Sequence, residues 1–72
     1  METDNWKGKQ FRQIRRSKLL TQNELAAKSN LSKQAISLIE TGVTRVPGPS
    51  TIKALADGLG ASLDKLLFLV ED

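Results

Sequence analysis

Residues 31–42, LSKQAISLIETG, carry side chains whose types and spacing could recognise hydrogen-bonding groups of a partner. With about 100° of rotation per residue of a helix, the apolar residues Ala35, Ile36 and Ile39 share one side. The other side and its shoulders carry an ammonium group, an amide, two hydroxyls and one leucine: Lys33, Gln34, Ser37, Thr41 and Leu38. Glutamine can bind adenine through two hydrogen bonds, lysine binds guanine acceptors, hydroxyls suit several base edges, and leucine can contact the thymine methyl group. Because an exposed helix is polar outside by default, this helix alone leaves base recognition and plain solvation both open.

The distribution of charge is the second feature that bears on a partner. The net charge of the chain is only +3, but residues 7–45 contain nine lysines and arginines against two glutamates. The flanking segments, 1–6 and 46–72, are each net acidic. One side of the domain is therefore suited to a polyanion, although a solvated basic surface would have the same composition.

The residue types that the chain lacks argue against catalysis. The sequence contains neither cysteine nor histidine, which removes disulfides, thiolate nucleophiles, the usual zinc ligands and an imidazole base. No metal-ligand cluster, nucleophile–base set or glycine-rich phosphate loop occurs either. We expect no enzyme activity, no metal, no cofactor and no small-molecule substrate. The polar N-terminus and the shortness of the apolar runs predict a cytoplasmic protein without a membrane partner.

Helical spacing of apolar residues recurs five times, and no sustained alternation predicts a strand. The fold class is therefore expected to be all-α. The first helix should span about residues 7–18, with a thin inward stripe of Phe11, Ile14 and Lys18 and with its arginines facing outward.

Capping residues place the ends of the next two helices. Thr21 and Glu24 form a capping box at the start of the second, and Asn30 tolerates the left-handed conformation that ends a helix. Ser32 is suited to cap the third helix, and Gly42 is suited to stop it. The connection of three or four residues matches the short turn of a helix-turn-helix motif.

Two further helices follow a loop at residues 43–49, in which Gly48 stands between two prolines. The fourth helix should run from near Ser50 to Gly60, and the fifth should start at the cap Ser62. The residues expected to be buried are Ile52, Leu55, Ala56 and Leu59 in the fourth helix, and Leu63, Leu66 and Leu67 in the fifth.

The string TQNELAAKSNLSKQAISLIETG resembles the core of the λ-repressor-like helix-turn-helix domains, also called the Cro or xenobiotic-response-element type. The resemblance covers residues 8–67 and includes Thr-Gln-x-Glu-Leu-Ala, Leu-Ser-x-x-x-Ile-Ser-x-Ile-Glu-x-Gly, and then Ala56, Leu59, Gly60, Leu63 and Leu66. It implies one compact five-helix domain over residues 1–72 that binds double-stranded operator DNA as a homodimer, with the third helix in the major groove. It also implies a prokaryotic or phage-type protein that is associated with the nucleoid.

The resemblance assigns roles to individual positions. Gln22 matches a glutamine that holds a DNA phosphate at the start of the second helix, and Arg45 lies where the following loop contacts the DNA backbone. Arg15 and Glu40 match an internal salt bridge between the first and third helices. The full set of expected DNA-contacting residues is Gln22, Asn23, Ser32, Lys33, Gln34, Ser37, Leu38, Thr41 and Arg45.

The sequence departs from the family pattern at three places. Leu19 stands where relatives often have glycine or asparagine to end the first helix, and Asn30 replaces the commoner glycine of the turn. The loop VTRVPGPS is longer and richer in proline than in many relatives. These departures concern local backbone geometry and leave the expected fold unchanged.

The apolar run at residues 66–70 is too long for one face of a helix. We expect part of it, including Phe68, Leu69 and Val70, to form a two-fold contact with a second copy. The alternative is that the run packs on the first helix beside Trp6.

The function that we expect is a sequence-specific transcriptional regulator, most often a repressor with a palindromic operator. One alternative is an antitoxin that regulates its own toxin–antitoxin operon. Another is a protein-interaction or coactivator domain that uses the same fold without reading bases.

Overall fold

A computed structural model describes residues 5–70, and in this part of the chain every regular element is helical. The elements are α1 (Trp6–Ser17), α2 (Gln22–Ser29), α3 (Lys33–Glu40), α4 (Pro49–Leu59) and the short 3₁₀ helix η1 (Leu63–Leu69). The expected all-α fold class with five helices is confirmed, except that the fifth helix is a 3₁₀ helix. No helix among the described residues has the length and apolar character needed to cross a membrane.

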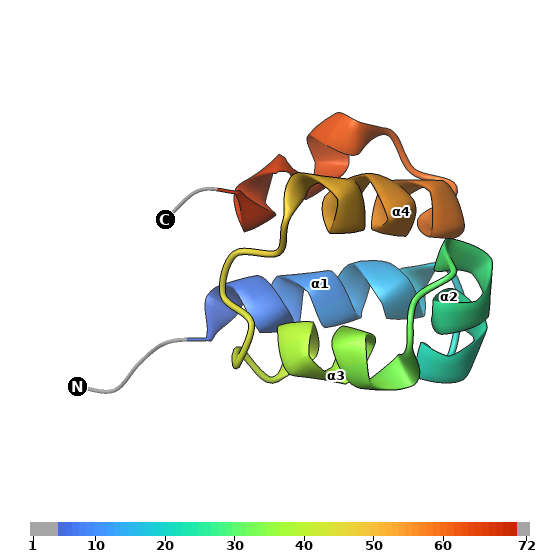
Figure 1. The fold of residues 1–72 in the computed structure, drawn as a ribbon, viewed down its shortest axis with the longest axis horizontal. Coiled ribbons are helices and arrows are strands. Elements are labelled where there is room, and N and C mark those ends of the chain that lie inside the picture. The colour runs from blue at the N-terminus through green and yellow to red at the C-terminus, as the bar shows by residue number, and fades with distance from the viewer. Residues whose placement is uncertain (1–4, 71–72) are drawn as a thin grey trace.

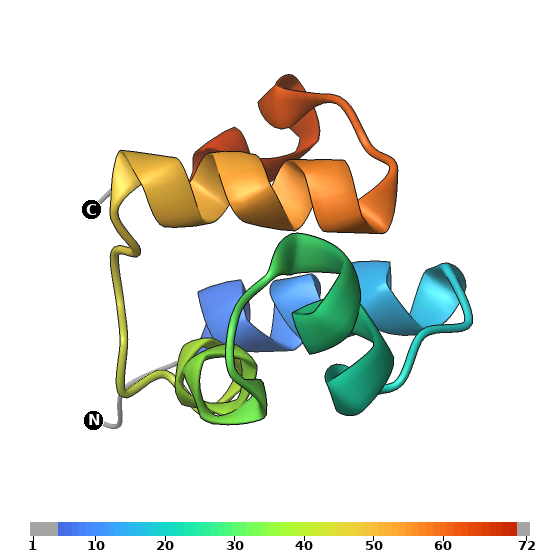
Figure 2. The same ribbon diagram turned by 45° about the vertical axis from the view of Figure 1, so that its right-hand side comes forward.

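The helices α4 and η1 lie on one side of the molecule, and α1 and α3 lie on the other (Figures 1 and 2). In Figure 1, α4 and η1 lie above α1, and α3 lies below it, while α2 closes one end. The most extensive helix contacts are those of α2 with α4 and of α2 with α3, followed equally by α1 with α3 and α4 with η1. The helix α3 is thus held from two sides by α1 and α2, which leaves its remaining face outward.

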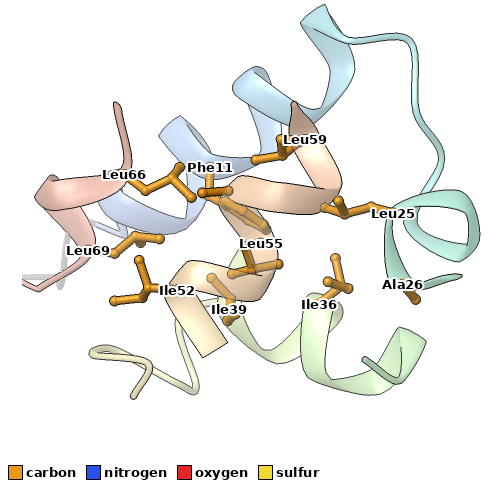
Figure 3. Packing of buried hydrophobic residues seen from close by; sticks show 11 residues of the cluster. Phe11, Leu25, Ala26, Ile36, Ile39, Ile52, Leu55, Leu59, Leu66 and Leu69 are labelled. Carbon is orange, nitrogen blue, oxygen red and sulfur yellow. The ribbon is translucent and has the colours of Figure 1, made fainter. Parts of the chain in front are cut away.

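The hydrophobic core takes residues from every helix (Figure 3). Ile36 and Ile39 bring the inner face of α3 into contact with Leu55 of α4 and Phe11 of α1 in one cluster. The buried apolar residues are Phe11, Leu25, Ala26, Ile36, Ile39, Ile52, Leu55, Ala56, Leu59, Leu66 and Leu69. The predictions for the inner face of α4 and for Ile36 and Ile39 on the inner side of α3 are therefore confirmed, while Ala35 is half-buried.

The ends of α2 and α3 follow from their capping residues. The Thr21 hydroxyl accepts from the Glu24 amide at 3.0 Å, and the Glu24 carboxylate accepts from the Thr21 amide at 2.8 Å. Asn30 takes the left-handed conformation (φ 59°), and Ser32 accepts from the Ala35 amide at 3.1 Å. The predicted caps Thr21, Asn30 and Ser32 are thus confirmed, whereas α3 has Thr41 as its C-cap, with Gly42 after it, and Ser62 precedes η1 without a side-chain capping hydrogen bond. The helix α4 begins at Pro49, one residue before the expected start, because proline is well suited to the first helical turn.

Two expectations for the inner surface of α1 were wrong. Lys18 is exposed and ends the helix instead of belonging to its inward stripe, and Ile14 is only partly buried. Arg15 does not face outward, since only 7% of it is exposed. The buried face of α1 is therefore made by Gly8, Phe11 and Arg15, and one of its members is a charged side chain with a partner on α3.

The expected burial in the fifth helix was also partly wrong. Leu66 and Leu69 are buried, whereas Leu63 and Leu67 are 49% and 45% exposed. A 3₁₀ helix has three residues per turn, so that residues i and i+3 align on one face. This alignment places Leu69 beside Leu66 and turns Leu67 toward solvent. Leu63 shares the face of Leu66 but is the first residue of η1, and it stays half exposed.

Leu19 has a left-handed backbone (φ 60°) and is 90% exposed. A residue with a Cβ atom pays about 1–2 kcal/mol of steric strain in this conformation. The exposed Leu19 side chain makes no packing contacts that would offset this strain. Because glycine costs about 0.5–1 kcal/mol in unfolded-state entropy, Leu19→Gly should raise the free energy of unfolding by up to about 1 kcal/mol in urea denaturation. Asn30→Gly is the matched control, because asparagine already tolerates φ 59°, and it should change stability little. A Leu19→Gly variant less stable than the parent would contradict this account.

Candidate nucleic-acid interface

The helices α2 and α3 are joined by a turn of three residues, Asn30 to Ser32. The Leu31 amide donates to the Ala26 carbonyl at 2.9 Å, which closes the C-terminal end of α2. The Leu31 side chain packs against the core, so the turn is anchored as well as short. This is the geometry of a helix-turn-helix motif, as the capping residues predicted.

The outward surface of α3 has the composition that its spacing predicted. Ile36 and Ile39 are buried, whereas Lys33 and Gln34 in the first turn are exposed. Ser37 and Leu38 are half-buried in the middle of the helix. The side chains best placed to meet a partner are therefore the lysine and the glutamine at the N-terminal end.

The other candidate residues lie on the segments that flank this surface. Asn23 and the half-buried Gln22 belong to the first turn of α2, Ser32 precedes α3, and Thr41 and Arg45 follow it. Two hydroxyls in this set already serve the helix itself. Ser32 accepts from the Ala35 amide, and Thr41 donates to the Ser37 carbonyl at 2.9 Å. The Ser32 hydroxyl can still donate to a ligand, whereas Thr41 can act there only as an acceptor.

The buried carboxylate of Glu40 joins three helices. It accepts from Arg15 through Nε at 2.5 Å and Nη2 at 3.1 Å, and from Arg12 Nε at 3.4 Å. It also accepts from the Gln22 amide at 3.1 Å, and Arg15 donates further to the Leu20 carbonyl at 2.7 Å. The predicted Arg15–Glu40 salt bridge is confirmed. It fixes the C-terminal end of α3 to α1, and the hydrogen bond from Gln22 fixes the same end to α2.

The Gln22 amide has a role that the sequence did not reveal. One of its N–H groups is directed at Glu40, so the side chain is oriented by the ion pair before any ligand arrives. The amide oxygen and the second N–H group remain as further hydrogen-bonding capacity of the side chain. No spacing signal connects residue 22 with residue 40, because the contact depends on how α2 packs against α3.

The Asn5 side chain makes a second connection that sequence reasoning missed. Its Nδ2 donates to the Glu40 carbonyl at 3.0 Å, and its Oδ1 accepts from the Gly8 amide at 3.3 Å. A Cβ at Gly8 or at Gly42 would overlap the Asn5 side chain, and Gly42 also has φ 88°. An asparagine three residues before a helical glycine is a recognisable capping signal, but its reach to α3 is not.

The environment of Glu40 shifts its proton affinity in two opposing directions. Burial raises the pKa of the Glu40 carboxyl, because none of the side chain is exposed and the charged form loses water. The hydrogen bonds from Arg15, Gln22 and Arg12 and the positive charge of Arg15 act the other way and prevail. The pKa of Glu40 therefore lies below its usual value, and the group is charged at neutral pH.

This lowered pKa makes the stability of the domain depend on pH. A carboxyl group whose pKa is lower in the folded protein than in the unfolded chain stabilises the fold at pH values above its unfolded pKa, which is about 4.3 for glutamate. This stabilisation is lost as the pH falls through the pKa of the folded state. We expect the urea midpoint to hold from pH 7 to about pH 5 and to fall below about pH 4. Glu24 also has a lowered pKa, from its hydrogen bonds with Thr21, so Glu24→Gln serves as the control. A Glu24→Gln variant that lost all the acid sensitivity would contradict the assignment to Glu40.

Among residues 5–70, no group of three histidine, cysteine, aspartate or glutamate residues could hold a metal ion. The chemistry of the described surface is instead that of hydrogen-bond donors, hydroxyls and cationic side chains on and around α3. Such groups are suited to bind a partner through hydrogen bonds and charge, and they do not form a nucleophile–base pair.

Comparison with known proteins places this arrangement in a family. The helix-turn-helix family model matches residues 11–66. The HTH-type transcriptional repressor RghR of Bacillus subtilis (strain 168) is 43% identical over 61 residues, which cover 85% of this chain and 45% of that protein. The uncharacterized HTH-type transcriptional regulator y4dJ of Sinorhizobium fredii is 44% identical over 55 residues, which cover 76% of this chain and 70% of that protein. The matched segment thus spans less than half the length of the Bacillus repressor.

A solved structure supports the same conclusion at the level of the fold. The crystal structure of a mutant of the restriction-modification controller protein C.Esp1396I has a TM-score of 0.74 and 28% sequence identity. The match covers 93% of this chain and 88% of the controller protein. The two curated relatives are named as helix-turn-helix transcriptional regulators, and the controller protein has the same fold. The chain belongs to the Cro/C1-type helix-turn-helix family.

Proposed function

We propose that this chain is the DNA-binding domain of a transcriptional repressor that places α3 in the major groove of a palindromic operator. The observation that carries the proposal is the exposed first turn of α3, which presents Lys33 and Gln34 while Ile36 and Ile39 anchor the opposite face. The N-terminal residues of this helix are the ones that contact base edges in helix-turn-helix proteins. A regulator of this kind would act in the cytoplasm, where its DNA target lies.

The candidate residues divide into two roles under this proposal. Gln34 can pair with adenine and Lys33 with guanine, while Ser37 and Leu38 reach bases or nearby phosphates from the middle of α3. The residues placed against the sugar-phosphate backbone are Gln22, Asn23, Ser32 and Arg45. Thr41 can donate to a phosphate there only if its hydroxyl turns away from the Ser37 carbonyl. The residues that flank α3 and those that begin α2 would therefore hold the DNA, and the first turns of α3 would read it.

Selection from a random pool of duplex DNA tests the proposal directly. We expect an enriched consensus with two inverted half-sites, and log affinity for it should fall linearly with log salt at about −0.9 per phosphate neutralised. A scrambled duplex of the same composition is the control for non-specific binding. Failure to enrich any sequence, together with an affinity that is independent of salt, would contradict DNA recognition.

We further propose that two copies bind the operator as a homodimer through the C-terminal surface. Leu63, Leu67 and Val70 are each nearly half exposed on and after η1, whereas Leu69, which was expected at this contact, is buried in the core. Trp6 is also half exposed, and its ring lies against that of Phe68 at a tilt of 37°, with 5.9 Å between the centroids, so Phe68 packs beside Trp6 as the alternative expectation stated. A dimer that binds both half-sites needs its two α3 helices about 34 Å apart, on successive major grooves. We propose that a two-fold contact across this surface provides that spacing.

The substitution Leu67→Asp tests the dimer without disturbing the core, because Leu67 is 45% exposed. Burial of a leucine side chain in the dimer contact contributes about 1.5–3 kcal/mol to the free energy of association. We therefore expect Leu67→Asp to lower the association constant of the dimer by about tenfold or more. Sedimentation measures the assembly, and affinity for full and half operators measures its effect on binding. Leu19→Asp is the control, since Leu19 lies outside this surface. A wild-type protein that is monomeric at high concentration and binds palindromes no better than half-sites would contradict the dimer.

A further inference from the structure

The carboxylate of Glu40 holds two partly exposed side chains that come from different helices. Arg12 of α1 donates to it through Nε at 3.4 Å, and Gln22 of α2 donates through its amide nitrogen at 3.1 Å. The acceptor is the same oxygen, Oε1, in both hydrogen bonds. Because the two nitrogens share one acceptor, the guanidinium group of Arg12 and the amide of Gln22 lie next to each other.

Arg12 carries a positive charge that the carboxylate does not need. Arg15 already neutralises Glu40, because it donates to both carboxylate oxygens through Nε and Nη2. Arg15 is buried, whereas the Arg12 side chain is 42% exposed and makes one longer hydrogen bond. The surplus positive charge of this cluster therefore lies on Arg12, at the surface.

Both side chains keep hydrogen-bond donors for a ligand. Within residues 5–70 the Arg12 guanidinium donates only through Nε, so the N–H groups on its Nη atoms remain, as does the second amide N–H of Gln22. The backbone amides of Gln22 and Asn23 also open α2 without an intrahelical acceptor. The carboxylate of Glu24, the acidic residue of this turn, accepts from the Thr21 amide.

We infer that Arg12 and Gln22 hold the same phosphate of the DNA backbone, with Arg12 supplying the charge and Gln22 an orienting hydrogen bond. The inference rests on the proposed function and adds α1 to the elements that contact the duplex. A phosphate suits this pair, because its oxygens accept from adjacent donors at once and match the planar fork of an arginine. Glu40 fixes both donors before the DNA arrives, so little side-chain freedom is lost on binding.

Neutral substitutions of single phosphates test whether the two residues share one. In a methylphosphonate a methyl group replaces the charged oxygen, so a series of operator duplexes with one such change each shows where the protein needs a phosphate. One position should weaken binding of the wild-type protein, lose most of its effect on Arg12→Gln and lose part of its effect on Gln22→Ala. Lys65→Gln is the matched control, because it makes the same charge change at an exposed residue of η1, and it should keep the wild-type profile.

The salt dependence of binding measures the charge of Arg12 independently. Arg12→Gln should reduce the slope of log affinity against log salt by about one unit, with base preferences intact. Gln22→Ala removes no charge and should weaken binding with little change of slope. Arg12→Lys keeps the charge without the planar fork, so it should keep most of the slope. A purely structural role of Arg12 would leave the slope of Arg12→Gln at the wild-type value.

The inference is overturned if Arg12→Gln keeps the wild-type slope and phosphate profile, or if Arg12 and Gln22 act at different phosphates. Arg12→Gln should fold, because Arg15 keeps its bonds to Glu40, and circular dichroism checks this. Arg12→Met, which keeps the aliphatic stem, replaces it if that variant unfolds.

Failure of the proposed function gives a different result, because the wild-type protein would then select no operator. The salt slopes on a random duplex would still decide whether Arg12 meets a phosphate. A wild-type protein that binds no DNA at all would overturn both the proposed function and the role of Arg12. A protein that selects an operator but loses nothing through Arg12 contradicts the shared phosphate alone.

Discussion

Glu40→Gln should lower the free energy of unfolding by about 3–5 kcal/mol at neutral pH, because it leaves the Arg15 guanidinium buried without a counter-charge. Arg15 is 7% exposed and donates to Glu40 through two nitrogen atoms. A domain of this size has a total stability near the lower end of about 5–15 kcal/mol, so the loss is a large share of the whole. Urea denaturation followed by circular dichroism measures it.

Two further variants separate the buried pair from charge in general. Lys53→Gln breaks the exposed pair of Lys53 with Asp57, whose side chains are 73% and 69% exposed, and should cost about 0–1 kcal/mol. The double variant Arg15→Met with Glu40→Leu should recover much of the loss, since apolar residues of similar volume often replace a buried pair at little cost. Should Glu40→Gln cost no more than Lys53→Gln, the ion pair is not what fixes α3 to α1.

Gln34→Ala and Arg45→Ala should weaken DNA binding in two different ways. Gln34 is exposed in the first turn of α3, so its loss should cost about 1–3 kcal/mol on the preferred operator and relax discrimination at one base pair. Arg45 is exposed in the loop after α3, where a cationic side chain suits the sugar-phosphate backbone. Its loss should weaken all sequences nearly equally and reduce the salt slope by about one unit.

Both variants are measured against the operator and against each single-base change within it, at several salt concentrations. Asn23→Ala on α2 provides a comparison within the backbone-holding group, and it should leave base preferences unchanged. If Gln34→Ala lowers affinity uniformly while every base preference persists, then α3 does not read DNA through Gln34. The assignment of the outward face would then be wrong even if the domain still binds DNA.

The helices whose ends are marked by local capping chemistry were the ones predicted most accurately from the sequence. Thr21, Glu24, Asn30 and Ser32 act on the backbone within three or four residues of their own position, so their effect is visible in a short window of sequence. The inner faces of α3 and α4 followed in the same way, because their periodic spacing determines which residues align. The polar surface of α3 was predicted from that same spacing.

The errors came where a residue's environment depends on a distant element. Arg15 was expected to face outward by its type, yet it is buried because Glu40, 25 positions later, compensates its charge. Leu67 was expected to be buried, but the fifth helix is a 3₁₀ helix, which changes the residues that share a face.

The sequence by itself determined the all-α class, the short turn between α2 and α3 and the outward residues of α3, since local capping and helical periodicity specify them. Only the tertiary structure decided which polar groups meet across helices: Gln22 and Arg12 with Glu40, and Asn5 with the end of α3. These groups lie up to 35 residues apart in the chain. Their encounter depends on how three packed helices are oriented, and no periodicity within one segment encodes that orientation.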